Sequence, residues 1–332
     1  MSLITLHEAT VANSTAKRAS VLLHCRGRNC RDLLSVEVPQ WNTLGLRVAE
    51  MAVVGATLFI NVLLIVAIVS ARRLLVSPFY KLFAILAAVF LVHCSSVMVL
   101  KLIPIFLPYS FKYQSEISLY IDIFVKCYSI QLIFILTLHR SMSFLAKRMS
   151  ELLFMGWRQC ILPSASFLLS AAMAVVVMVV DKMHRKYVSW LGYADYAEST
   201  IALTVLNYFC LVITFFSIIL HFFIYSWMRN TNKNFMVSEE SRLNKAERVM
   251  LLQAILTTTI ELVFLIFFIV IPTLQMREND LYLIVSLYNI LCSIPELLMP
   301  LFVLFISRDI KQSLGQIIAV QSIEMHLMKS VT

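Results

Sequence analysis

The sequence has little glycine, proline and charge for its length. Only six of its 332 residues are Gly and eight are Pro, and 14% are charged, whereas 60% are apolar. The scarcity of Gly and Pro excludes a collagen-like chain or a low-complexity linker, and the apolar content excludes intrinsic disorder. Seven Cys are too few for a disulfide scaffold of this length. The chain is therefore far more apolar than a soluble domain, in which about 25% of the residues are charged.

The apolar residues fall into seven long blocks with charged clusters between them. A helix needs about 20 mostly apolar residues to cross a bilayer. The predicted spans are residues 51–71, 82–100, 117–138, 159–180, 200–228, 249–271 and 281–306. We therefore predict an all-α membrane protein, with a seven-transmembrane helix bundle at 49–306. An N-terminal tail at 1–48 precedes it, and a C-terminal tail at 307–332 follows it.

The distribution of Lys and Arg predicts the orientation of the bundle. The first, third and fifth loops and the C-terminal tail hold 15 of these residues, and the other three loops hold six. Basic residues stay on the cytoplasmic side, so the C-terminus is predicted to be cytoplasmic and the N-terminus outside. The tripeptide Asn13-Ser14-Thr15 agrees, because it is an N-glycosylation acceptor that works only on an exported segment. The net charge of +9 then reflects retention of basic loops, and no nucleic-acid partner is expected.

Several short motifs carry a family resemblance. The segment Ser77–Phe83 at the start of the second span resembles the nematode serpentine chemoreceptors, particularly the Srg-like classes of G-protein-coupled receptors. The segments Ile294–Pro300 and Ser307–Ile310, at the end of the seventh span, share that resemblance. Asn61 resembles the asparagine motif of a first receptor helix, and Arg140 matches the arginine that ends a third helix. The disulfide that usually joins the third helix to the second outer loop is missing, since neither segment has a Cys there.

The resemblance implies a chemosensory receptor that binds an external small-molecule or peptide cue and activates a heterotrimeric G protein. It also implies a multi-pass protein of the plasma membrane, including that of a sensory cilium. An enzyme is not expected, because the sequence contains neither a His-x-x-x-His pair nor a Gly-x-Ser-x-Gly motif. No cofactor or metal is expected either.

Ionisable residues inside the predicted spans are candidates for function, because burying a charge in a membrane is costly. Asp122 and Lys126 are four residues apart, so they share a helix face and can pair with each other. Glu261 is an alternative partner for Lys126, since each lies twelve residues from the cytoplasmic end of its span. His93 and Glu296 lie inside their spans as well, so a buried polar cluster joining the second, third, sixth and seventh helices is geometrically possible.

Such a cluster can bind a ligand or can be a structural salt bridge without a ligand role, and the sequence leaves both open. Polar and aromatic residues of other spans could line a pocket beside it. The predicted ligand-binding residues are Asp122, Lys126, Tyr208, Glu261, Tyr288 and Asn289.

A carrier or channel is the alternative function, with Lys126, Glu261 and Glu296 forming a path for protons or substrate. The odd number of spans and the absence of internal repeats weigh against it. Basic residues on the cytoplasmic side can dock a G protein, although many serve only to fix the topology. The predicted contacts are Arg140, Lys147, Arg148, Arg242, Lys245 and Arg248. The helical spacing of Ile310, Leu314, Ile317 and Ile318 predicts a short amphipathic helix on the inner leaflet.

Overall fold

The computed structural model describes the first five predicted spans and part of the C-terminal third of the chain. The described residues are 40–71, 74–106, 112–145, 147–188, 192–234, 293–307, 310–313 and 315, with scattered positions between 255 and 291. The sixth predicted span, 249–271, lies mostly outside the described residues. The helices, contacts and cavities named from here on are those of this part of the chain.

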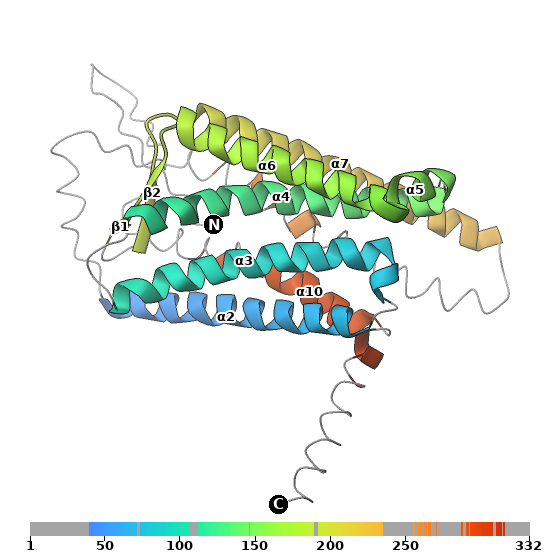
Figure 1. Cartoon of the computed structure of the whole chain (residues 1–332), viewed down its shortest axis with the longest axis horizontal. Coiled ribbons are helices and arrows are strands. Elements are labelled where there is room, and N and C mark those ends of the chain that lie inside the picture. Colours follow the sequence, from blue (N-terminus) through green and yellow to red (C-terminus); the bar gives the residue numbers. More distant parts are fainter. Residues whose placement is uncertain are drawn as a thin grey trace, which may run out of the picture.

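Long helices dominate the described chain. They are α2 (Gln40–Ser70), α3 (Pro78–Phe106), α4 (Lys112–Leu145), α6 (Ile161–Val180) and α7 (Ile201–Asn234), with the shorter α5 (Lys147–Phe154) and α10 (Ile294–Ile306). Among the described residues, five helices are long and apolar enough to cross a membrane, and Ile294–Phe305 forms a shorter apolar helix. The five long helices run side by side along the length of the molecule (Figure 1). The prediction of an α-helical membrane protein is confirmed by this arrangement.

Several helices extend beyond the predicted spans, and α2 and α4 are the clearest examples. Helix α2 begins at Gln40, inside the predicted tail at 1–48, and α4 covers Lys112–Leu145 instead of 117–138. Both helices continue through polar residues beyond their apolar blocks. A hydropathy pattern marks the part of a helix that fits the hydrocarbon core, whereas backbone hydrogen bonds can extend the helix beyond it.

Helix α4 is the central helix of the described bundle. Of its apolar segment 72% is buried, whereas none of the other four described spanning helices exceeds 39%. Helix α6 shows the opposite behaviour, with its buried residues confined to one face that contains Ser170, Ala174 and Val177. The neighbouring Val175 is half-exposed, as expected for a side chain that faces lipid. Small side chains on the buried face let α6 approach α4 closely, and Gln131 of α4 donates a 3.0 Å hydrogen bond to Ser170.

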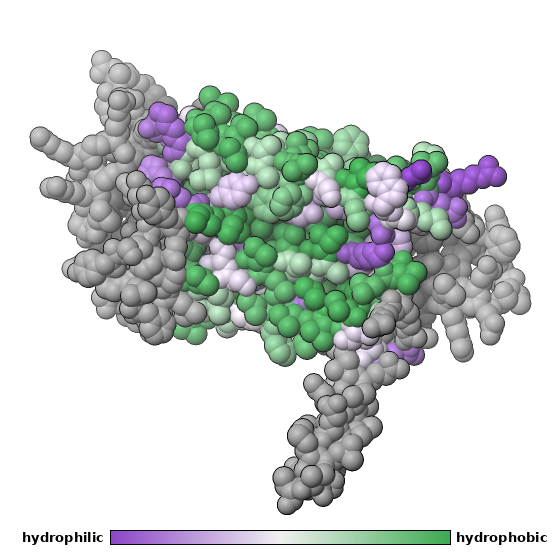
Figure 2. Space-filling view, viewed as in Figure 1, coloured by the Kyte–Doolittle hydropathy of each residue, from purple (hydrophilic) through white to green (hydrophobic). Residues whose placement is uncertain are grey.

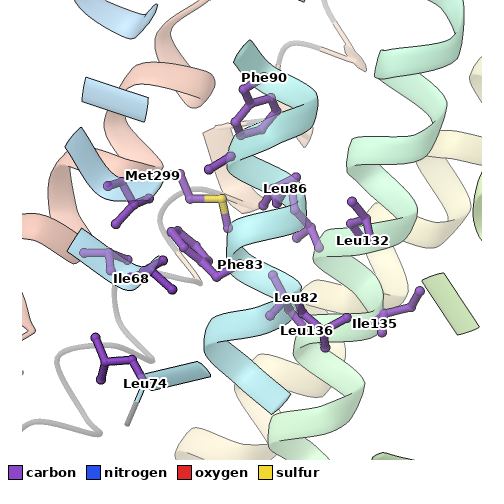
Figure 3. Packing of buried hydrophobic residues seen from close by; sticks show 14 of the residues in the cluster. Ile68, Leu74, Leu82, Phe83, Leu86, Phe90, Leu132, Ile135, Leu136 and Met299 are labelled. Atoms are coloured by element: carbon purple, nitrogen blue, oxygen red, sulfur yellow. The ribbon is translucent and has the colours of Figure 1, made fainter. Parts of the chain in front are cut away.

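The main apolar core joins α2, α3, α4 and α10. Phe83 and Leu86 of α3 lie between Ile68 of α2, Leu132 of α4 and Met299 of α10 (Figure 3). All five side chains are buried. Apolar side chains also cover the middle of the bundle surface, with hydrophilic residues toward its two ends (Figure 2). This distribution is that of a protein surrounded by lipid at mid-height.

A β-hairpin between α6 and α7 closes one end of the bundle, called here the hairpin end (Figure 1). Its strands β1 (His184–Val188) and β2 (Gly192–Tyr196) are antiparallel, and Arg185 pairs with Asp195 in the register. Asp181, at the end of α6, accepts backbone hydrogen bonds from Ala202 and Leu203 in the first turn of α7. A carboxylate at a helix N-terminus satisfies free N–H groups and favours the helix dipole. Asp181 therefore fixes both ends of the loop that carries the hairpin.

The opposite end, called here the Arg140 end, includes α5 and the start of the C-terminal tail. Residues 310–313 and 315 are helical. Ile310 is buried in the main core, and Ser313 donates a 2.9 Å hydrogen bond to the carbonyl of Ala67 in α2. The first part of the predicted amphipathic helix is thus attached to the bundle, while Ile317 and Ile318 lie outside the described residues.

Candidate functional site

Five ionisable side chains meet inside the hairpin end of the bundle. We call them the hairpin-end ion cluster: Asp122 of α4, His93 of α3, Glu296 of α10, and Arg185 and Asp195 of the hairpin. None of these five side chains is more than 12% exposed. Buried charges are stable only when they are paired and hydrogen-bonded. Each member of the cluster accordingly lies within 3.0 Å of another member.

Arg185 is the centre of the cluster on the hairpin side. Its guanidinium binds Asp195 through two bonds, Nε to Oδ1 at 2.6 Å and Nη2 to Oδ2 at 3.0 Å. The same group reaches α4, with Nη2 2.7 Å from Asp122 Oδ2 and Nη1 donating to Ser118 Oγ at 3.0 Å. The planar fork of an arginine is suited to such bidentate contacts with carboxylates.

The electrostatic surroundings hold Arg185 in its charged form. Burial by itself disfavours the charge of the guanidinium, but the carboxylates of Asp195 and Asp122 outweigh burial and raise its pKa. The hairpin is thereby joined to α4 by a charged guanidinium that lies 2.7 Å from the Asp122 carboxylate. This contact lies between the second loop on the hairpin side and the third span, where the usual receptor disulfide is missing from the sequence.

His93 extends the cluster from α4 to α10. Its Nε2 lies 3.3 Å from Asp122 Oδ1, and its Nδ1 lies 2.9 Å from Glu296 Oε1. Asn61 of α2 donates a 3.3 Å hydrogen bond to the backbone carbonyl of Glu296. The imidazole therefore bridges two carboxylates on different helices. Together with Arg185, it forms a continuous chain of charged and polar contacts from the hairpin to α10.

Three side chains in this region could hold a metal ion. The donor atoms of His93, Cys94 and Glu296 all lie within 4.8 Å of one another. A nitrogen, sulfur and oxygen set of this kind suits zinc. The same groups already bind one another, since the Cys94 thiol approaches Glu296 Oε2 at 3.6 Å and His93 contacts the same carboxylate. These contacts account for their positions without an ion.

Asp122 and Lys126, which their spacing allows to pair, contact other residues in the described structure. Asp122 pairs with Arg185 and His93, while Lys126 Nζ donates a 3.0 Å hydrogen bond to Oδ1 of Asn207 in α7. The shared helix face made the pairing possible, but a cation from the hairpin and an imidazole from α3 occupy the carboxylate instead. The alternative partner of Lys126, Glu261, lies outside the described residues.

The other predicted ligand-binding residues are placed differently. Tyr208 is 53% exposed, so its ring lies on the outer surface of α7, away from the ion cluster. Its neighbour Asn207 is buried and faces Lys126, because adjacent helix residues point about 100° apart. Tyr288 and Asn289 lie outside the described residues, as does the predicted glycosylation site Asn13.

The Arg140 end holds a second group of polar residues around a small cavity. The Arg140 guanidinium lies 4.4 Å from the centre of the Phe79 ring, a cation–π contact between α4 and α3. One turn deeper, Thr137 Oγ1 lies 3.0 Å from His221 Nε2 of α7. The residues that line the cavity include Phe79, Phe83, Thr137, Arg140, His221, Thr258 and Met299. The cavity is therefore formed by α3, α4, α7, α10 and residue 258.

The structure places only some of the predicted G-protein contacts. Arg148 is exposed on α5, and Lys147 is the first residue of that helix, so both lie at the Arg140 end. Arg242, Lys245 and Arg248 lie outside the described residues.

Sequence reasoning missed Arg185, Asp195 and Ser118 at the hairpin-end ion cluster, and Asn207 beside Lys126. By sequence, Arg185 is only one of the six basic residues in the three loops that hold few Lys and Arg. The segment His184–Tyr196 has Tyr and Val before Gly192 and two Tyr after it, which is a hairpin signal. That signal predicts a hairpin, but not that the hairpin inserts an arginine between the helices.

One comparison with known proteins gives a match. The family model described as serpentine type 7TM GPCR chemoreceptor Srv matches residues 51–320. No curated protein gives a significant match. The family match covers most of the chain and includes every helix that joins the hairpin-end ion cluster. The resemblance to serpentine chemoreceptors is thereby confirmed, and the chain belongs to the Srv family of seven-transmembrane G-protein-coupled chemoreceptors.

Proposed function

We propose that this receptor binds an external small-molecule or peptide cue near its hairpin end and activates a heterotrimeric G protein at its Arg140 end. The N-terminus lies outside and the C-terminus in the cytoplasm, and the receptor works in the plasma membrane, including that of a sensory cilium. Family membership supports a chemosensory receptor, and the family is a receptor family rather than an enzyme family. The finer assignments rest on the geometry of the two ends.

The observation that carries the proposal is the chain of contacts from Arg185 through Asp122 and His93 to Glu296. It joins a loop at the hairpin end to α4, α3 and α10 through side chains that are nearly all buried. A ligand that changes the contact of Arg185 with Asp122 would change the charge beside His93, which lies 3.3 Å from the other oxygen of that carboxylate. A binding event at the hairpin would thus alter the restraint on α10, which also lines the cavity at the other end through Met299.

The Arg140 end has features that suit coupling to a partner. Arg140 is half-buried and held against Phe79, so a modest shift of α3 relative to α4 would loosen its guanidinium. Cation–π contacts of this kind contribute about 0.5–2 kcal/mol, which is small enough for a switch to break. The exposed Arg148 on α5 provides a further basic contact for the acidic or polar surface of a G protein.

Nucleotide exchange on a reconstituted G protein tests the proposal. The receptor in lipid nanodiscs should accelerate exchange when a cue from a broad panel of volatile and water-soluble compounds is added. Arg140→Ala should remove the acceleration, and Arg140→Lys is the matched control that keeps the charge at the same position. Cue-dependent uptake of solute by receptor-containing vesicles, without any exchange, would instead support the carrier alternative.

A further inference from the structure

Arg185 makes two sets of contacts, one within the hairpin and one with α4. Its two bonds to Asp195 lie within the hairpin, because the two residues are directly opposite each other in the strand register. Its contacts with Asp122 and Ser118 cross to α4. The two strands carry five consecutive register pairs, which begin at His184 with Tyr196 and end at Val188 with Gly192. The hairpin can therefore move as a unit while Arg185 keeps its carboxylate partner.

Release of the hairpin from α4 would affect the charges of Arg185 and Asp122 differently. Arg185 would leave with Asp195 still bound, so the guanidinium would remain paired. Asp122 would lose the cation on Oδ2 while its side chain remains among α3 and α4, with only His93 on Oδ1. Burial of an incompletely paired carboxylate is strongly unfavourable. The vacated position therefore favours another cation, and the bundle side of the contact already presents the acceptors for one.

The vacated position also specifies the kind of cation. It would present two acceptors, Asp122 Oδ2 and Ser118 Oγ, which in the described structure receive N–H groups of one guanidinium. Groups with several N–H donors on one positive charge, such as guanidinium and primary ammonium, match both acceptors. A quaternary ammonium has no N–H group and a urea has no charge, so each matches only half of the requirement.

We propose that Arg185 is an internal substitute for the ligand, and that the cue carries a guanidinium or primary ammonium group that displaces it from Asp122 and Ser118. This inference rests on the proposed function, because it assumes an external ligand at the hairpin end. The displaced hairpin swings away with its Arg185–Asp195 pair intact. The ligand cation binds Asp122 Oδ2, so Asp122 Oδ1 keeps its contact with His93. Because His93 also contacts Glu296, the replacement of Arg185 by the ligand can affect α10.

Hydrogen–deuterium exchange on the purified receptor tests the displacement without a G protein. The probes are methylguanidine and butylamine, with tetramethylammonium and methylurea as matched controls. The two N–H cations should raise exchange in a saturable manner at those backbone amides of residues 184–188 and 192–196 that do not bond across the two strands, and the controls should not. Asp122→Asn should weaken the apparent affinity by about 10- to 100-fold, the equivalent of one charge-assisted hydrogen bond. If none of the probes changes hydrogen–deuterium exchange of the hairpin amides in the wild-type receptor, the proposal is overturned.

A second variant separates a ligand site from a structural clamp. Arg185→Met removes the internal cation with little change in volume, and its melting temperature should rise with millimolar methylguanidine but not with methylurea. Adding Asp122→Asn to Arg185→Met should abolish the rise. If Arg185→Met folds and ignores methylguanidine, or fails to fold even when methylguanidine is present throughout preparation, the site does not accept an external cation. Because these readouts need no G protein, a receptor that binds these cations but does not couple would contradict only the coupling proposal.

Discussion

The two ends of the bundle hold their helices together by different physics. At the hairpin end, a buried ion pair joins Arg185 to Asp122 at 2.7 Å, and His93 contacts the carboxylates of Asp122 and Glu296 at 3.3 and 2.9 Å. At the Arg140 end, no buried ion pair is seen among the described residues, and the contacts are a cation–π contact with Phe79, a neutral polar contact between Thr137 and His221, and apolar packing around Met299. Buried ion pairs tolerate little displacement, because a lost partner leaves a charge without compensation. Apolar and cation–π contacts are less directional and let helices shift at lower cost.

This difference suits the two proposed tasks. A recognition site benefits from contacts that are either made or broken, since a ligand can then select one of two arrangements. A coupling surface has to adapt to a partner and change its shape when α10 or α3 moves. The central helix α4 connects the two ends, with Asp122 near one and Arg140 near the other. Substitutions at each end can therefore test whether the two ends differ as much as their contacts indicate.

The largest expected effect is the loss of Asp122. Asp122→Ala leaves Arg185 and His93 without the carboxylate that joins them, and breaking a buried pair costs about 3–5 kcal/mol. We expect a large fall in surface expression and in the melting temperature of the detergent-solubilised receptor. The matched control is Glu198→Gln in the exposed pair with Lys182, where the loss should stay below about 1 kcal/mol. Equal effects of both variants would contradict a special role for the buried cluster.

An intermediate effect is expected at Asn207. Asn207→Leu removes the amide oxygen that accepts a hydrogen bond from Lys126, and hydrogen bonds to charged groups contribute about 1.5–3 kcal/mol. Thermal unfolding should show a clear destabilisation. Tyr208→Leu, at the exposed neighbouring position, is the control and should change stability by less than about 0.5 kcal/mol. If the two variants unfold alike, the inward orientation of Asn207 has no energetic consequence.

A smaller effect on stability, with a larger one on signalling, is expected at the Arg140 end. Phe79→Leu removes the ring beneath Arg140 and should destabilise the receptor by about 1–2 kcal/mol through the loss of the cation–π contact and part of the packing. Because the guanidinium is then less restrained, basal nucleotide exchange should rise while surface expression changes little. Phe79→Tyr keeps the ring and should leave basal exchange near the wild-type level. A rise of the same size in both variants would argue against the contact as a restraint.

The helices could be predicted from the sequence because lipid imposes a simple requirement, namely a long apolar block whose backbone satisfies itself. A buried polar cluster that includes His93 and Glu296 could also be anticipated, since depth follows from position along a helix. The partner of Asp122 could not be predicted in this way. That partner, Arg185, is distant from α4 along the chain, since 67 residues separate it from Ser118, which it also contacts. Whether it reaches α4 depends on how far its loop folds into the bundle. Local pattern cannot specify such a contact, and proximity along the helix favoured Lys126 instead.

The orientation of the two ends across the membrane can also be tested. The substitutions that test it should have the smallest effect on stability. If the hairpin end faces outward, Asn13 is exported and carries a glycan, because Asn13-Ser14-Thr15 is an acceptor site. Glycosidase treatment should then lower the apparent mass of the expressed receptor, and Asn13→Gln should remove that shift without changing folding. The matched control is Ser14→Ala, which keeps both Asn13 and Thr15 and should retain the glycan. A tag at Thr332 should bind antibody only in permeabilised cells. Labelling of this tag on intact cells would reverse the orientation, placing Arg140 and its cavity outside and the hairpin with Arg185 in the cytoplasm.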